Sequence, residues 1–119
     1  MIDITATLQS TSEKWTQEQA IKLCRKIEPI AFYNKFHIAL TGGLLYKNGE
    51  RKDCDIIVYS IRYSYKNDEE FQDGKKLFLD SLKEILSFHT IRDHGFVVKS
   101  IYEGKTVDIM FPEDDGNYD

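Results

Sequence analysis

The run DCDIIVYS, residues 53–60, constrains the fold of this chain more than any other stretch. Its Ile-Ile-Val centre is typical of a strand, because β-branched side chains fit a pleated surface. Asp53 and Asp55 are two positions apart, so their carboxylates project from the same side of a strand. Two close carboxylates raise each other's pKa and destabilise a fold, and a divalent cation reverses that penalty. The run therefore indicates a strand that brings a cation-binding pair into the sheet, and we expect its centre to be buried on both faces.

Residues 16–31 upstream predict a helix. Thr16 can cap it, Gln19 completes a capping box, and Trp15 is placed as a hydrophobic staple. We expect Pro29 to kink this helix or to divide it in two, because proline lacks the N–H that a helix interior needs. The expected apolar stripe consists of Ile21, Cys24, Ile27 and Ala31.

Four further segments complete the predicted fold. FHIAL, residues 36–40, reads as a short buried strand that leads directly into Gly42 and Gly43, and IDITATLQS reads as an edge strand or ordered arm. A second helix is expected over about 69–88, with Gly74 as a weak point. GFVVKSIY and KTVDIMF are predicted strands joined by a tight turn at 103–104. The apolar stripe expected for the second helix comprises Phe71, Phe78, Leu82, Ile85 and Leu86.

This element order predicts an α/β (α+β) domain, a small mixed β-sheet flanked by helices. With 119 residues there is room for a single domain, which we place at residues 1–111. The last eight residues, PEDDGNYD, hold four acids and no base, and we expect an acidic, flexible tail over 112–119.

Charge and composition limit the function. Outside the tail, sixteen basic residues balance sixteen acidic ones, so the broad basic surface of a phosphate-dominated nucleic-acid binder is not expected. No apolar run approaches the ~20 residues of a membrane span, and the start of the chain lacks the features of a signal peptide, so we expect a cytoplasmic protein. Cys24 and Cys54 are expected to be buried thiols.

Asp108 is an isolated acid in the otherwise apolar segment TVDIMF. A carboxylate there requires a partner, a metal ion or an orientation toward solvent. The Gly42-Gly43 turn at the end of a strand lets backbone N–H groups approach an anion closely, although most such turns are only turns. Beside an Asp-x-Asp strand and a later strand acid, the turn becomes a candidate phosphate site.

The pattern ALTGG, nine residues, DCDIIV and a later VDIMF resembles the polymerase-beta-like nucleotidyltransferase superfamily. The resemblance implies that Gly42 and Gly43 hold a nucleoside triphosphate (NTP). It also implies that Asp53 and Asp55 ligate two Mg²⁺ (or Mn²⁺) ions, with Asp108 as the third ligand and a base for the acceptor hydroxyl. The implied reaction moves a nucleoside monophosphate from an NTP to a hydroxyl acceptor and releases pyrophosphate.

Where this family often has Ser and Arg, the present chain has Gly43, Leu44 and Leu45. The basic residues of this region come later in the sequence: Lys47, Arg51 and Lys52. They either neutralise the triphosphate or belong to a solvated loop.

The acceptor is not identified by the sequence, and a protein partner or a second copy of the chain would help to bind it. The neutral body disfavours a nucleic-acid acceptor. The alternative function is a non-catalytic nucleotide-binding or antitoxin-like interaction module of the same fold. A metal-dependent phosphohydrolase is a third reading, with less need of the Gly-Gly turn.

Overall fold

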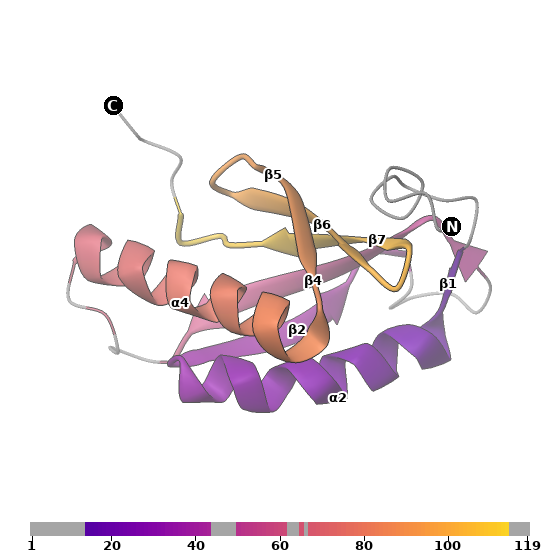
Figure 1. Ribbon diagram of the computed structural model, residues 1–119, viewed down its shortest axis with the longest axis horizontal. Coiled ribbons are helices and arrows are strands. Elements are labelled where there is room, and N and C mark those ends of the chain that lie inside the picture. The colour runs from indigo at the N-terminus through magenta and orange to yellow at the C-terminus, as the bar shows by residue number, and fades with distance from the viewer. Residues whose placement is uncertain (1–13, 44–49, 62–64, 66, 115–119) are drawn as a thin grey trace.

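A five-stranded mixed sheet with two helices on one face forms the framework of the computed structural model (Figure 1). The structure describes residues 14–43, 50–61, 65 and 67–114. The strand order is β2-β4-β7-β6-β5, with β4 and β7 parallel and the other neighbours antiparallel. The strands are β2 (Phe36–Thr41), β4 (Asp53–Ser60), β5 (His89–Asp93), β6 (Val97–Tyr102) and β7 (Lys105–Met110). The predicted fold class is confirmed.

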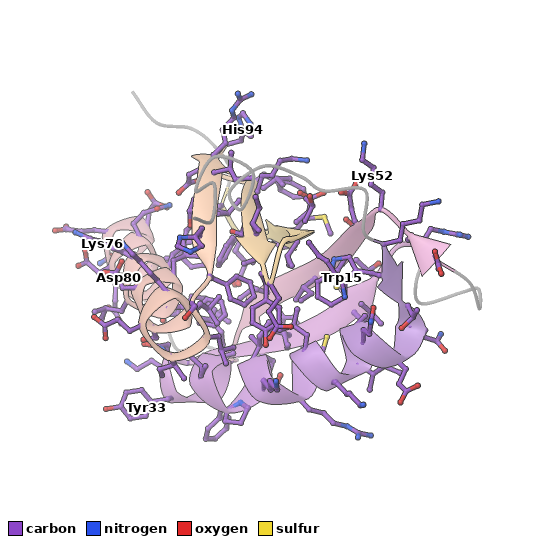
Figure 2. All side chains as sticks on the ribbon, turned by 45° about the vertical axis from the view of Figure 1, so that its right-hand side comes forward. Trp15, Tyr33, Lys52, Lys76, Asp80 and His94 are labelled. Atoms are coloured by element: carbon purple, nitrogen blue, oxygen red, sulfur yellow. The ribbon has the colours of Figure 1, made fainter. Side chains whose placement is uncertain are left out.

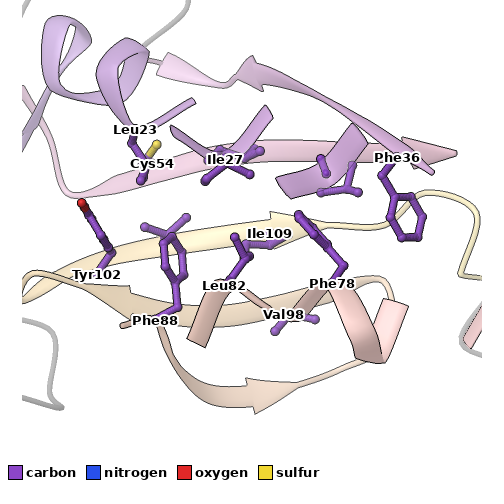
Figure 3. Packing of buried hydrophobic residues seen from close by; sticks show 14 of the residues in the cluster. Leu23, Ile27, Phe36, Cys54, Phe78, Leu82, Phe88, Val98, Tyr102 and Ile109 are labelled. Atoms are coloured by element: carbon purple, nitrogen blue, oxygen red, sulfur yellow. The ribbon is translucent and has the colours of Figure 1, made fainter. Parts of the chain in front are cut away.

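The helices α2 (Gln17–Tyr33) and α4 (Asp68–Leu86) cover the same face of the sheet. Figure 3 shows side chains from both helices meeting those of the central strands in one core. Phe36, at the start of β2, is fully buried and packs against aromatic rings from α4 and from the residue after β7. The described helices include none that is long and apolar enough to cross a membrane.

Strand β4 is buried on one face only, which corrects the expectation of burial on both. Cys54, Ile56 and Val58 face the helices and are fully buried, whereas the alternate residues are partly or fully exposed. Both aspartates belong to the alternate set, so the acidic face of β4 is the face without helices. Strand β2 is likewise less buried than predicted, because it lies at the edge of the sheet.

Helix α2 begins with the predicted capping box between Thr16 and Gln19. It continues through Pro29 as a single helix, so the predicted division is wrong. Pro29 lies on the exposed side, where water can solvate the carbonyl that loses its N–H partner. The buried stripe is shifted from the prediction: Ile21 is exposed, and the buried residues are Ala20, Leu23, Ile27 and Ala31.

Helix α4 is capped by the Asn67 side chain, which accepts a hydrogen bond from the Glu70 N–H, and it ends at Ser87 in the left-handed conformation. The expected contribution of Ile85 to the core is wrong, because this residue is exposed. Gly74 is not a weak point but a packing requirement. A Cβ at Gly74 would collide with the Tyr65 hydroxyl, which donates a hydrogen bond to the Asn34 carbonyl (2.6 Å).

The predicted hairpin of β6 and β7 is confirmed, with Glu103 and Gly104 both at positive φ in its turn. Strand β5 was not predicted, because every one of its side chains is exposed and no apolar alternation marks it. A small second sheet, in which β1 (Trp15–Thr16) pairs with β3 (Glu50–Arg51), was also missed. The strand or arm predicted within residues 1–10 lies outside the described residues.

The described part of the expected tail is held by side-chain contacts. Glu113 accepts hydrogen bonds from the backbone and hydroxyl groups of Ser60, both at 2.6 Å. Asp114 is buried and accepts a hydrogen bond from the Lys75 ammonium at 2.9 Å. These contacts hold Glu113 and Asp114 against the rest of the domain.

Candidate active site

Asp55 and Asp108 are direct neighbours on the two parallel strands at the centre of the sheet. They are register partners in the β4–β7 pair, so their side chains project from the same face. The core-facing partners on either side, Cys54 with Val107 and Ile56 with Ile109, show that this face is the one opposite the helices. Two acids that are 53 positions apart in the sequence thus meet on one surface.

The Gly42 turn lies beside this pair because β2 ends there. Thr41 is the register partner of Asp55, and the chain turns at the next residue with φ +75° at Gly42. A Cβ at Gly42 would collide with Asp55 Oδ2. Glycine is required here for two reasons: the left-handed conformation, and the close approach of the backbone to a carboxylate.

Arg51 approaches the second glycine of the turn. A Cβ at Gly43 would collide with Arg51 Nε, so the guanidinium stem packs directly against the Gly43 backbone. Pairing of β3 with β1 places Arg51 opposite Trp15, and its Nη1 donates a hydrogen bond to the Glu50 carbonyl at 2.9 Å. A permanent positive charge therefore lies beside the turn predicted to receive phosphates.

Of the other two basic residues proposed for this role, the structure describes Lys52 alone. Lys52 is exposed and extends outward from the molecule (Figure 2). Lys47 lies outside the described residues.

The electrostatics of the pair are unfavourable without a cation. The pKa of Asp55 is raised, first by burial and then by the negative charges of Asp108 and Asp53; Lys99 opposes the shift. Lys99 is the register partner of Asp108 on β6, and its Nζ lies 3.4 Å from Asp108 Oδ1. Lys99 thus acts on both Asp55 and Asp108.

Asp108 Oδ1 is buried and has no hydrogen-bond partner among the described residues. The Lys99 contact satisfies the distance of an ion pair but lacks the geometry of a hydrogen bond, and we regard it as an ion pair only. Buried carboxylate oxygens are normally hydrogen-bonded, so an unsatisfied one needs an explanation. It is a suitable donor atom for a cation.

Asp53 stands two residues before Asp55, at the start of β4, opposite Thr106. As the side chains stand, the described residues contain no group of three or more His, Cys, Asp or Glu side chains gathered closely enough to hold a metal ion. The donor set nevertheless fits Mg²⁺ in chemistry, because Mg²⁺ takes one or two carboxylates and keeps other positions for water and phosphate. The structure supplies two adjacent carboxylates of this kind, at Asp55 and Asp108, with a third next along the strand.

The cavities among the described residues include four of about 130 to 450 Å³, and none of these four is lined by any of the three aspartates. All involve helix residues or the hairpin turn. We give them less weight than the aspartate face, because charge and register, rather than concavity, distinguish that face.

The sequence reasoning missed Lys99. The signal was present, since Lys99 is the one charged residue within the apolar segment GFVVKSIY, as Asp108 is within TVDIMF. Opposite charges at the centres of two strands joined by a tight turn are candidates for cross-strand partners.

Several other titratable side chains make structural contacts. His37 Nδ1 lies 2.8 Å from Glu28 Oε1, whereas His89 is exposed. Cys54 is a fully buried thiol, as predicted, whereas Cys24 is only partly buried; burial raises the pKa of both thiols, that of Cys24 to about 11. Tyr65 packs on Phe36 and covers the core.

No protein-family model and no curated protein matches the sequence. Solved structures do match. Crystal structures of Leishmania infantum polymerase beta, in a ternary gap complex and a ternary P/T complex, superpose with TM-scores of 0.70 and 0.67 at 13% and 14% identity. They cover 91% and 84% of this chain, which itself spans only about two fifths of their length (40% and 43%). The chain thus has the polymerase-beta-like nucleotidyltransferase fold, and the resemblance inferred from its sequence is confirmed at the level of the fold.

Proposed function

We propose that this chain, with its nucleotidyltransferase fold, transfers a nucleoside monophosphate from an NTP to a hydroxyl acceptor and releases pyrophosphate. The observation that carries the proposal is the register of Asp55 with Asp108 beside the Gly42 turn. A structural sheet gains nothing from two like charges placed side by side, since the pair destabilises it. A site for cations with their phosphates explains both the acids and the glycine.

Asp53, Asp55 and Asp108 are the residues that would hold two Mg²⁺ or Mn²⁺ ions. When bound, such ions neutralise the charge that develops on the attacking and leaving oxygens of an in-line displacement. Asp108 Oδ1 has no hydrogen-bond partner among the described residues, so it is available as a donor atom.

The Gly42-Gly43 turn would receive the triphosphate through its backbone N–H groups, with Arg51 neutralising phosphate oxygens. In the proposed reaction the acceptor oxygen forms a bond to the α-phosphorus, and the bond from that phosphorus to the pyrophosphate oxygen breaks. Asp108 takes the acceptor proton, and pyrophosphate leaves with the electron pair. Lys52, which is exposed, and Lys47, which lies outside the described residues, are proposed as further contributors to phosphate binding.

The acceptor surface would come from outside the described residues, through a partner protein or a second copy of the chain. The balanced charge of the body leads us to propose a small molecule or a protein hydroxyl as acceptor rather than a nucleic-acid end.

The test is the melting temperature with Mg²⁺ or Mn²⁺ and each of the four NTPs. At ~100-fold excess over Kd, ligand binding adds ~2.7 kcal/mol, a rise of the order of ten degrees for a domain of this size. The double variant Asp53→Asn with Asp55→Asn should lose this rise. Asp73→Asn with Asp80→Asn, which removes two exposed acids from α4 (Asp80 in Figure 2), should keep it.

The products distinguish the alternatives. Pyrophosphate release and transfer of α-phosphate label to an acceptor support the transferase. A nucleotide-dependent rise without pyrophosphate, together with a co-purifying partner, would instead support the non-catalytic module. Orthophosphate or nucleoside monophosphate as product would indicate a phosphohydrolase. Absence of any metal-dependent rise would contradict the proposal.

A further inference from the structure

Lys99 occupies a specific place beside the aspartates. It lies on β6 directly opposite Asp108, on the face without helices, with Nζ 3.4 Å from Asp108 Oδ1. Asp108 has the more buried side chain, 16% exposed against 43% for Lys99. The ammonium group thus reaches a largely buried carboxylate from the solvent side.

The contact compensates charge without completing a hydrogen bond. Asp108 Oδ1 has no hydrogen-bond partner among the described residues even though Lys99 is close. A half-exposed lysine has a flexible four-carbon stem and a strongly hydrated head, so it can leave the carboxylate for water at low free-energy cost. Such a group compensates charge and is easily displaced.

The strand register supports the same role. Asp108 is the partner of Lys99 on one side and of Asp55 on the other, so the ammonium group lies on the same face of the sheet as both central carboxylates. A lysine and a divalent cation cannot both neutralise the same pair without repelling each other.

We propose that Lys99 is the internal counter-ion of the candidate metal site: it neutralises Asp108 in the metal-free protein and gives way when a divalent cation binds, so that it sets the cation affinity. The inference rests on the proposed function for the existence of the metal site. Lys99 is a positioning residue, since it acts through Asp108 and not on the reacting atoms.

The variant Lys99→Met tests the inference, because it should change stability and Mn²⁺ affinity in opposite directions. Methionine keeps the length and apolar stem of the side chain. Without metal, the variant should be less stable than the wild type, because Asp108 loses its counter-ion. Its affinity for Mn²⁺ alone, measured by isothermal titration calorimetry without nucleotide, should rise by about tenfold, the order expected for removing one charge near a partly exposed site. A residue with a merely structural role would lower both quantities.

Two further variants serve as controls. Lys99→Arg keeps the charge and should retain an Mn²⁺ affinity close to that of the wild type. Lys76→Met makes the same change in net charge. Lys76 is exposed on α4, which covers the opposite face of the sheet, and it lies far from Lys52 in Figure 2. This variant should leave the Mn²⁺ affinity unchanged.

In the wild type, the Lys99 ¹⁵Nζ resonance should shift on addition of Mg²⁺, and Asp108→Asn should abolish that shift. Unchanged or weaker Mn²⁺ binding by Lys99→Met, while the wild type binds, would overturn the inference and leave the proposed function intact. Failure of both proteins to bind Mn²⁺, alone and with an NTP, would overturn both.

Discussion

The described structure contains two clusters of charged side chains, one whose charges are paired and one whose charges repel. Behind the sheet, Lys75 on α4 is almost fully buried, and its ammonium donates to Asp114, Asp93 and the Gly95 carbonyl at 2.9–3.2 Å. On the open face, Asp55 and Asp108 repel each other, and one of their oxygens has no hydrogen-bond partner among the described residues.

The two clusters differ in whether each charge has its partners. A buried ion-pair network is retained when each member has its partners, because an unpaired buried charge is costly. An unsatisfied acidic pair on an exposed face lowers stability, and a fold retains such a feature where a ligand completes it. The Lys75 cluster therefore stabilises the domain, whereas the aspartate pair has the properties expected of the cation site that we propose.

The largest expected effect comes from breaking the satisfied cluster. Lys75→Met should lower the free energy of unfolding by about 3–5 kcal/mol, because Asp114 keeps a buried negative charge after losing its ammonium partner. Urea denaturation monitored by circular dichroism measures this loss. Lys76→Met, one residue further along and exposed, should stay within about 0.5 kcal/mol of the wild type. Equal stability of both variants would show that the cluster is not structural.

A second change sharpens the comparison at the glycine turn. Gly42→Ala should destabilise the protein by about 2 kcal/mol, since alanine is strained at φ +75° and its Cβ collides with Asp55. It should also abolish the rise in melting temperature with Mg²⁺ and NTP.

Gly104→Ala is the matched control for strain, because Gly104 has φ +80° in the β6–β7 turn, four residues before Asp108 along the chain. It should be destabilised to a similar extent in urea and keep the response to metal and nucleotide. A Gly42→Ala protein with the full ligand response would contradict the proposed role of this turn.

The smallest expected effect is a gain in folding stability. Because the pKa of Asp55 is raised in the folded protein, its ionisation opposes folding: its contribution to stability is complete below the ordinary pKa of 3.8 and is lost as pH rises through the folded-state pKa. Asparagine does not ionise. Without metal, Asp55→Asn should therefore be more stable at pH 7 by at most about 1 kcal/mol, since solvent at the open face screens the repulsion.

This gain should shrink toward zero as the pH falls to 3.8 and below, as thermal melts over a pH series would record. Asp80→Asn, at an exposed position on α4, is the control for the loss of one negative charge. A stability difference that is constant with pH, or a destabilised Asp55→Asn, would contradict the idea that Asp55 and Asp108 repel each other.

Local patterns predicted both helices and four strands of the main sheet, but not β5, the small second sheet or all of the buried faces. The capping box at Thr16, the hairpin turn at Glu103-Gly104 and the Asp-x-Asp strand depend on neighbours in sequence, and each was found as expected. The buried faces of α2 and α4 were partly wrong at Ile21 and Ile85, since burial depends on where a helix lies against the sheet rather than on hydrophobicity alone.

By itself the sequence determined the fold class, the helix and strand that lead to the glycine turn, and the candidate acids, because periodicity, capping and turn chemistry act over a few residues. The tertiary structure was needed to show that Asp55 and Asp108 are adjacent and that Lys75 is buried with Asp114. Both pairs join elements far apart in the chain, whereas the Lys99–Asp108 ion pair spans a single hairpin. Register and packing, which depend on the whole sheet closing at once, bring them together.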